Sequence, residues 1–178
     1  LLDTLREYDI HVTFFMIGTW VGNHGPWIET MIEDGHEIGN HTMNHPRFSE
    51  CTAVQIRKQV EQAGDRLLEN HNYTTRLLRP PYGSHTKVSD AVVRFLGYEV
   101  IMWGLTSGDA NADATAQQIT RRVLDNVKPG DIILFHNAAP QMRDYLVPIL
   151  DELIARGYTF GTVSELMGWT DETETPAS

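Results

Sequence analysis

The sequence predicts an α/β fold built from parallel strands, and three observations support this prediction. Short apolar runs typical of strands alternate with segments of about ten residues or more that have helical periodicity. The runs are apolar nearly throughout, as expected when helices cover both faces of a parallel sheet. Polar clusters follow four of the runs, and in such folds the chemistry gathers at the carboxyl ends of the strands. We therefore expect these clusters to meet at one rim.

The elements follow from local composition. The first strand is expected at residues 11–17 (HVTFFMI), because this run is β-branched or aromatic and ends before Gly18. The longest helix is expected at residues 52–69, where most apolar residues share one side. Two prolines exclude a helix at residues 79–83 (RPPYG). The other strands are expected at residues 36–39, 77–78, 98–103, 131–135 and 158–162. The other helices are expected at residues 25–35, 89–95, 114–126, 142–156 and 163–167.

The domain organisation is expected to be simple. Residues 1–169 are expected to form one domain, since no linker or internal repeat interrupts them. Residues 170–178 (TDETETPAS) are expected to form a flexible tail. The chain starts with Leu1 rather than Met, and residues 1–8 have the pattern of the last turns of a helix. We therefore expect a processed or partial chain.

Composition excludes some classes of partner. The 178 residues carry a formal net charge of −10, and no cluster of Lys and Arg is present to bind a phosphate backbone. Nucleic acid is therefore not an expected partner. No run of 18 apolar residues occurs, so no membrane insertion is expected. The acidic balance fits a neutral or basic substrate such as a glycan. Cys51 is the single cysteine, which excludes an intrachain disulfide.

The segment HTMNH places His41 and His45 four residues apart. In one helical turn, two imidazoles at that spacing project from the same face and can bind one metal ion. The same spacing occurs in the H-E-x-x-H helix of metalloproteases, but Thr42 stands where that chemistry needs Glu, so a protease is disfavoured. The alternative is a chance pair among the eight histidines of the chain.

Two further polar clusters suggest catalytic chemistry. The prolines of RPPYG fix the backbone, so that Arg79 can orient a carboxylate and the Tyr82 amide can donate to an oxyanion. The alternative is a surface turn with a solvated Arg. His136 ends an apolar strand and can act as a general acid or base, with Asp109 fixing its tautomer. The alternatives are a histidine bonded to backbone and an aspartate in a loop turn.

Taken together and in this order, the motifs resemble those of the NodB-type polysaccharide deacetylases, carbohydrate esterase family four. HVTFFMIG resembles the second strand of the family, EDGHEIGNHTMNHP its H-[ST]-x-x-H metal motif, and RPPYG its R-x-P-Y loop. IMWGLTSGD resembles the fourth motif, ILFH the closing L-x-H motif, and GYTFGTVSEL the last strand and helix. The resemblance covers roughly residues 1 to 168, and the motifs are specific as a set although each is weak alone.

The resemblance implies a distorted (β/α) barrel, lacking its first strand in this chain, that binds one divalent metal. Zinc is the expected metal, and cobalt, manganese and nickel are the alternatives. By the same resemblance, His41 and His45 would bind the metal. The Tyr82 amide would stabilise the oxyanion together with the metal, and Arg79 would orient the catalytic base.

The resemblance also assigns the remaining site residues. His136 would be the general acid that protonates the leaving amine, and Asp109 would tune it. Leu134 would line the pocket for the acetyl methyl group. Pro80 and Trp103 are further substrate-binding candidates.

Three departures from the family pattern affect these expectations. The first motif, T-F-D-D-G, is absent, although its Asp pair supplies the base and the third metal ligand in the family. We expect a truncation at the N-terminus, with an upstream segment carrying the pair, so this chain alone is expected to bind metal weakly. Ala110 replaces the Trp that usually follows the fourth-motif Asp, and Thr106 stands where an acidic residue is frequent.

The expected function is metal-dependent removal of acetyl groups from an acetylated polysaccharide. N-acetyl groups of peptidoglycan or chitooligosaccharide are favoured, and acetylxylan is also considered. The expected location is extracellular or associated with the cell wall, although the chain contains no signal peptide. The alternative is a non-catalytic descendant of the same fold that binds glycan or metal.

Overall fold

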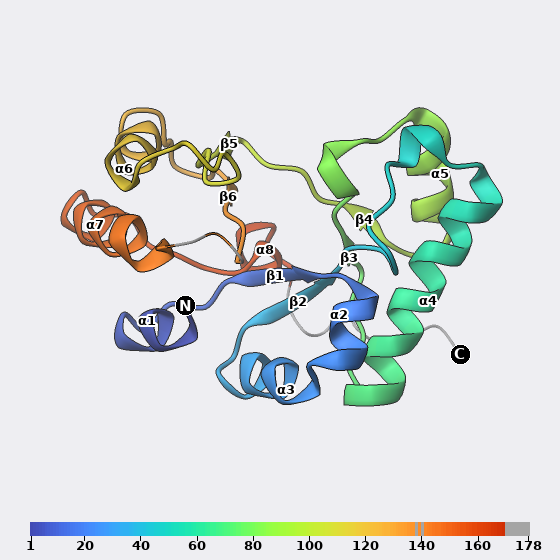
Figure 1. Cartoon of the computed structure of the whole chain (residues 1–178). Helices are drawn as coiled ribbons and strands as arrows, with labels where there is room; N and C mark the ends of the chain where they lie inside the picture. The colour runs from blue at the N-terminus through green and yellow to red at the C-terminus, as the bar shows by residue number, and fades with distance from the viewer. Residues whose placement is uncertain (138, 140, 170–178) are drawn as a thin grey trace. The chain divides into compact units, whose positions relative to one another are not determined.

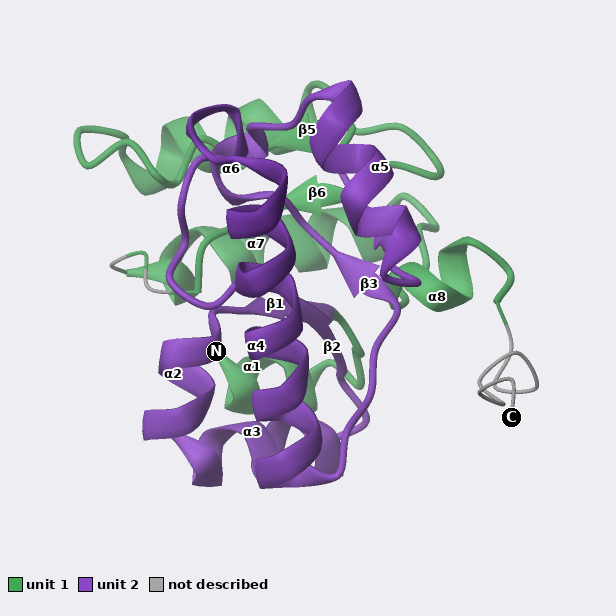
Figure 2. Cartoon of the chain, turned by 90° about the vertical axis from the view of Figure 1, so that its right-hand side faces the viewer, with its two compact units in different colours: residues 1–12, 103–178 green, residues 13–102 purple. Residues whose placement is uncertain are grey.

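The computed structural model describes residues 1–137, 139 and 141–169. The tail expected at residues 170–178 lies outside the described residues. The chain divides into two compact units, one formed by residues 13–102 and the other by residues 1–12 and 103–178 (Figure 2). Each unit is built from parallel strands and helices, as the sequence predicts. The expectation of one domain over residues 1–169 stays a prediction.

The unit of residues 13–102 contains a parallel sheet of four strands in the order β1-β2-β3-β4 (Figure 1). Its strands are β1 (Thr13–Met16), β2 (Glu37–Asn40), β3 (Leu77–Leu78) and β4 (Glu99–Val100). Its helices are α2 (Gly18–Asn23), α3 (Gly25–Glu33), α4 (Ala53–His71), α5 (Lys87–Phe95) and the 3-10 turns η1 (Phe48–Glu50) and η2 (Pro81–Gly83). In register, Met16 lies opposite Asn40 and Asn40 lies opposite Leu78, so the loops after β1, β2 and β3 leave the same edge.

Helix α4 packs against α2 and α5 in this unit. It begins with a capping box, in which Thr52 accepts from the Gln55 amide and the Gln55 side chain accepts from the Thr52 amide. Burial of its apolar side completes the core. This core cluster consists of Phe48, Ile56, Val60, Leu78 and Val93.

The second unit contains a parallel pair of strands, β5 (Leu105–Thr106) and β6 (Ile133–Leu134). Its helices are α1 (Leu2–Glu7), α6 (Ala116–Leu124), α7 (Met142–Ala155) and α8 (Val163–Leu166). Helix α6 packs against α7. Arg143 of α7 donates hydrogen bonds to Thr4 and Glu7 of α1. Within the described part of the chain, no helix is both long and apolar enough to span a bilayer.

Three strand predictions need correction. The strand predicted at residues 158–162 is absent, because this segment has no strand ladder and leads into the N-cap of α8 at Thr162. The strand predicted at residues 98–103 pairs only over β4, and the strand predicted at residues 131–135 pairs only over β6. An apolar run alone does not distinguish an extended segment from a paired strand, since pairing depends on a partner elsewhere in the fold.

Helix α2 was not predicted, because Gly18, Gly22 and Asn23 are poor helix formers. It forms because the loop after β2 holds its first turn. The amides of Gly18 and Thr19 donate to the carbonyls of Thr42 and Met43 at 2.9 and 3.0 Å. A Cβ at Gly18 would lie 2.7 Å from the Met43 sulfur, so a larger residue would displace this loop.

Candidate functional site

Two imidazoles meet just beyond the end of β2. The Nε2 atoms of His41 and His45 lie 3.0 Å apart. Nδ1 of His41 lies 2.6 Å from the carbonyl oxygen of Arg79. Since a carbonyl can only accept, Nδ1 of His41 carries the proton and Nε2 of the neutral ring presents a lone pair toward His45.

The loop that presents these rings is not a helical turn, contrary to the prediction. Thr42 and His45 both have left-handed backbone, with φ of 67° and 59°. Asn40, which is fully buried, accepts from the Thr42 amide at 2.8 Å and donates to the Val60 carbonyl at 2.9 Å. The Thr42 hydroxyl then accepts from the His45 amide at 3.1 Å. Side-chain hydrogen bonds therefore hold a strained loop that brings the two imidazoles together.

The pair fits a shared metal ion. Zinc binds imidazole nitrogen at about 2.0–2.1 Å, so two such ligands in tetrahedral coordination lie about 3.3 Å apart. The observed separation of 3.0 Å between the His41 and His45 nitrogens is close to this value. Among residues 1–137, 139 and 141–169, no group of three or more His, Cys, Asp or Glu could hold a metal. The histidine pair alone therefore falls short of a complete tetrahedral ligand set within the described residues.

Arg79 follows β3 and is buried rather than solvated, with 7% of its surface exposed. Its Nε donates to the Ile101 carbonyl and its Nη2 to the Met102 carbonyl, both at 3.3 Å. Its guanidinium lies 4.0 Å from the centre of the Phe15 ring. Burial lowers the pKa of Arg79 to about 10, which still leaves the side chain charged at neutral pH. The alternative of a solvated surface Arg is therefore wrong.

Tyr82 lies beside the histidine pair, on the turn that Pro80 and Pro81 begin. Its backbone is left-handed, with φ of 59°. Its ring centre lies 4.5 Å from that of His45, and the guanidinium of Arg47 lies over the same ring, 4.1 Å from its centre. The Tyr82 side chain is 56% exposed. The predicted oxyanion donor is thus held next to a predicted metal ligand.

A second cluster, formed by Asp109 and His136, lies in the other unit. Asp109 follows β5, and its Oδ1 accepts from Nδ1 of His136 at 2.8 Å while its Oδ2 accepts from the His136 amide at 2.7 Å. The Asp109 side chain is fully buried, whereas that of His136 is 47% exposed. The carboxylate fixes the Nδ1–H tautomer, which leaves Nε2 of His136 as the second proton site.

The charge of Asp109 is stabilised in place. Burial raises its pKa, but hydrogen bonds from the His136 side chain and amide and from Ser107 outweigh burial, so that the pKa is lowered. Asp109 therefore remains ionised at neutral pH. It can stabilise the proton on His136.

The predicted site residues thus fall into two clusters, one in each unit. His41, His45, Arg79 and Tyr82 form the histidine cluster of residues 13–102, and Asp109 and His136 form the acid cluster of the second unit.

The substrate-binding candidates divide in the same way. Pro80 is buried at the start of η2, and Leu134 is half-buried in β6, where its carbonyl accepts from the Ser107 amide. Trp103 is half-buried and is the first residue of the segment 103–178 in the second unit. Their contact with substrate stays a prediction.

Sequence reasoning missed three residues that hold these clusters. Asn40 supports the loop of the histidine pair, Arg47 covers Tyr82, and Tyr145 of α7 contacts Asp109. Asn40 is a polar residue at the end of a buried strand and stands directly before His41. This position is a sequence signal that could have identified it. Tyr145 lies in an apolar helix face, where its pattern is that of an ordinary core aromatic.

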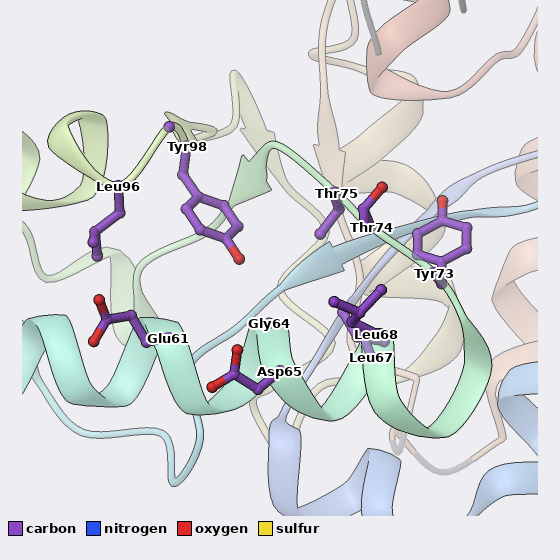
Figure 3. A pocket seen from close by; sticks show the side chains of 11 residues that line it. Glu61, Gly64, Asp65, Leu67, Leu68, Tyr73, Thr74, Thr75, Leu96 and Tyr98 are labelled. Carbon is purple, nitrogen blue, oxygen red and sulfur yellow. The ribbon is translucent and has the colours of Figure 1, made fainter. Parts of the chain in front are cut away.

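A pocket of about 350 Å³ lies elsewhere in the unit of residues 13–102 (Figure 3). It is lined by α4 and by residues that precede β3 and β4, among them Glu61, Asp65, Leu68, Tyr73, Leu96 and Tyr98. It is therefore at the amino ends of these strands. The histidine cluster follows the carboxyl ends, so this pocket is not the candidate site.

Comparison with known proteins decides the family. The family model described as polysaccharide deacetylase matches residues 1–101, which is more than half of the chain. The chain belongs to the polysaccharide deacetylase family. The prediction made from the sequence motifs is confirmed. Deacetylases of this family depend on a metal, in agreement with the paired imidazoles.

Relatives of this deacetylase chain are named as peptidoglycan deacetylases. It is 36% identical over 174 residues to the peptidoglycan-N-acetylglucosamine deacetylase of Bacillus cereus, a match that covers 94% of the chain and 80% of that protein. It is 30% identical to the peptidoglycan-N-acetylmuramic acid deacetylase PdaC of Bacillus subtilis, over 93% of the chain and 35% of PdaC. The chain therefore spans most of one relative and about a third of the other.

A solved structure supports the fold assignment. A pseudoenzyme of carbohydrate esterase family four from Bacillus anthracis matches with a TM-score of 0.88 and 25% identity, over 94% of the chain and 59% of that structure. The predicted fold class, a distorted (β/α) barrel of the NodB deacetylase type, is confirmed. The match also shows that this fold occurs in a protein described as catalytically inactive.

Proposed function

We propose that this protein removes N-acetyl groups from a bacterial cell-wall glycan, with the glucosamine units of peptidoglycan as the favoured substrate. One observation carries the proposal. His41 and His45 direct their Nε2 atoms at one point, 3.0 Å apart, while the Arg79 carbonyl fixes the His41 tautomer. The similarity to the peptidoglycan-N-acetylglucosamine deacetylase of Bacillus cereus supports the choice of glycan.

His41 and His45 would hold the metal, which we propose to be zinc because neutral imidazoles suit this ion. Cobalt, manganese and nickel are the alternatives. When bound, the metal would polarise the acetyl carbonyl and lower the pKa of water. We propose that an acidic ligand and the catalytic base come from an Asp pair outside residues 1–178, of the kind that the family carries in its first motif.

The other residues of the chain would supply positioning, charge and a proton. The Tyr82 amide would donate to the acetyl oxygen as negative charge develops there. Arg79, held by two carbonyls and the Phe15 ring, would orient the base. Nε2 of His136 would donate a proton to the leaving amine, and Asp109 would stabilise the protonated imidazole. Leu134, Pro80 and Trp103 would contact the substrate.

Acetate release from peptidoglycan tests this proposal. The full protein, including any residues that precede Leu1, should release acetate with zinc and lose this activity when zinc is chelated. Activity should return when zinc, cobalt or manganese is added. An absence of acetate release with each of these metals would contradict the proposal.

A second function, glycan binding without catalysis, is favoured by a separate observation. Among the described residues no group of three or more potential metal ligands is found, and the similar Bacillus anthracis protein is described as a pseudoenzyme. This alternative predicts that the full protein binds peptidoglycan fragments and releases no acetate under any metal. Either function is consistent with action at the cell wall, and we propose an extracellular or wall-associated location on the basis of the named relatives.

A further inference from the structure

We infer that Tyr145 is a positioning residue for the general acid: its hydroxyl holds the Asp109 carboxylate, which in turn sets the ring orientation and tautomer of His136. The inference rests on the proposed function, because only there does His136 protonate a leaving group. It concerns one unit of the chain, the one that contains α7, β5 and β6.

The geometry makes Tyr145 the third donor to one carboxylate. Its hydroxyl donates to Oδ2 of Asp109 at 3.3 Å. The same oxygen accepts from the His136 amide at 2.7 Å, and Oδ1 accepts from Nδ1 of His136 at 2.8 Å. Two of the three donors belong to His136. Tyr145 therefore limits the rotation of the group that determines which way the imidazole points.

The burial of Tyr145 shows that its hydroxyl has a specific partner. The residue is 1% exposed, and its ring stacks on Phe135, the neighbour of His136, with the planes 8° apart and the centres separated by 6.1 Å. A phenylalanine would fill this space equally well. The hydroxyl is the part that core packing does not explain, and Asp109 is the partner it reaches.

The hydroxyl stays a donor over the working pH range. Burial raises the pKa of Tyr145, and the charge and hydrogen bond of Asp109 raise it further. The neutral Tyr145 hydroxyl therefore stabilises the negative charge of the Asp109 carboxylate through its hydrogen bond. When the hydroxyl is removed, the Asp109 carboxylate loses one donor and becomes a stronger acceptor for Nδ1–H of His136. The protonated imidazole should then become more stable.

The charged side chains near Asp109 and Tyr145 are the same in the parent protein and in a variant that lacks only the Tyr145 hydroxyl. Arg122 of α6 packs over Gly108 and donates to the Thr106 carbonyl, next to Asp109. Arg143 and Asp144 lie beside Tyr145 along α7. A variant that removes only the Tyr145 hydroxyl leaves all of these in place.

The test is an NMR titration of the His136 ring in the full protein, compared between the parent and Tyr145→Phe. The signal is assigned with His136→Ala. In Tyr145→Phe we expect the titration midpoint of His136 to rise by about 0.3–1 pH unit. Tyr158→Phe is the matched control, because its hydroxyl donates to the Val127 carbonyl instead. It should leave the His136 titration unchanged.

A kinetic measurement adds a second readout. The alkaline limb of kcat should move upward with the NMR midpoint in Tyr145→Phe, while KM stays within twofold of the parent. Tyr145→Leu, which also lacks the hydroxyl, should shift the midpoint in the same direction if Tyr145→Phe does not fold. An unchanged His136 midpoint in a folded hydroxyl-free variant would overturn the inference. Because the titration needs no turnover, an inactive protein would contradict the proposed function without affecting this result.

Discussion

The backbone carbonyl of Arg79 accepts a 2.6 Å hydrogen bond from Nδ1 of His41, which links the loop after β3 to the histidine pair after β2. The two loops leave neighbouring strands of one sheet. The Arg79 amide also donates to the Asn40 carbonyl at 3.0 Å, so the connection is made twice through the backbone. The position of the histidine pair therefore depends on the RPPYG loop as well as on the loop after β2.

His41→Ala and His45→Ala should each abolish zinc uptake, because one remaining imidazole cannot chelate the ion. His136→Ala should leave metal uptake unchanged and stop turnover, since its ring is bonded to Asp109. Metal content after dialysis and calorimetric zinc titration measure these effects. His85→Ala is the matched control, because His85 pairs with Asp90. Zinc retained by both of the first two variants would refute the ligand assignment.

Asn40→Ala should lower the free energy of unfolding and weaken zinc binding together. It leaves the buried Thr42 amide without its acceptor, which costs about 1–3 kcal/mol, and removes the side-chain donor to the Val60 carbonyl inside α4. Asn40→Asp keeps the acceptor for the Thr42 amide but loses the donor to the Val60 carbonyl. It should therefore lose part of the stability that Asn40→Ala loses. Urea unfolding and zinc titration measure both quantities. The exposed Asn44→Ala should change stability little, and an equal effect there would contradict the role of Asn40.

Gly39→Ala should destabilise the protein through Phe15 and Arg79. An added Cβ at Gly39 would lie 2.5 Å from the Phe15 ring, on which the Arg79 guanidinium rests. Overpacking of this kind costs about 1–3 kcal/mol, and turnover should fall as well because Arg79 is displaced. Thermal unfolding and acetate release measure these losses. Gly25→Ala is the control, since its added Cβ would make an ordinary 3.5 Å contact. The idea fails if both alanine variants behave alike.

Asp109 should make the protein less stable in acid. Its pKa is lowered from 3.8 by folding, so its contribution is fully present above about pH 4 and is lost as the pH falls through the folded value. Asp109→Asn should therefore lower the free energy of unfolding at pH 7 and flatten its decline below pH 4. Denaturant unfolding between pH 2.5 and 7 would show this. Asp113→Asn, which changes an exposed carboxylate, should leave the slope as in the parent.

Much of the fold follows from local sequence signals. The capping residues Thr52, Thr86 and Thr115 each begin a helix where the apolar periodicity predicts one, within a few residues. The pair Leu77-Leu78 and the prolines after it correctly predict a short strand followed by a turn. These features depend on neighbours in the sequence, which is why composition and spacing are sufficient to predict them.

The geometry of the site could be predicted only in part. Spacing identifies His41 and His45, but not the left-handed backbone that brings them together, because that depends on the buried side chain of Asn40. The hydrogen bond from Tyr145 joins residues 36 positions apart, and no local pattern distinguishes this tyrosine from other core aromatics. Contacts between distant segments decide both features.

Some residues with left-handed backbone can be replaced to stabilise the protein, whereas others should be kept because their side chains support the site. Asp9 and Thr42 have similar backbone, with φ of 53° and 67°, and glycine or asparagine would adopt either conformation more readily. Asp9 follows the C-cap of α1 and belongs to neither cluster, so Asp9→Gly should raise stability without removing a side chain of either cluster. At Thr42 the same replacement would delete the hydroxyl that accepts from the His45 amide. A thermostable variant should therefore be sought among strained residues whose side chains support nothing else.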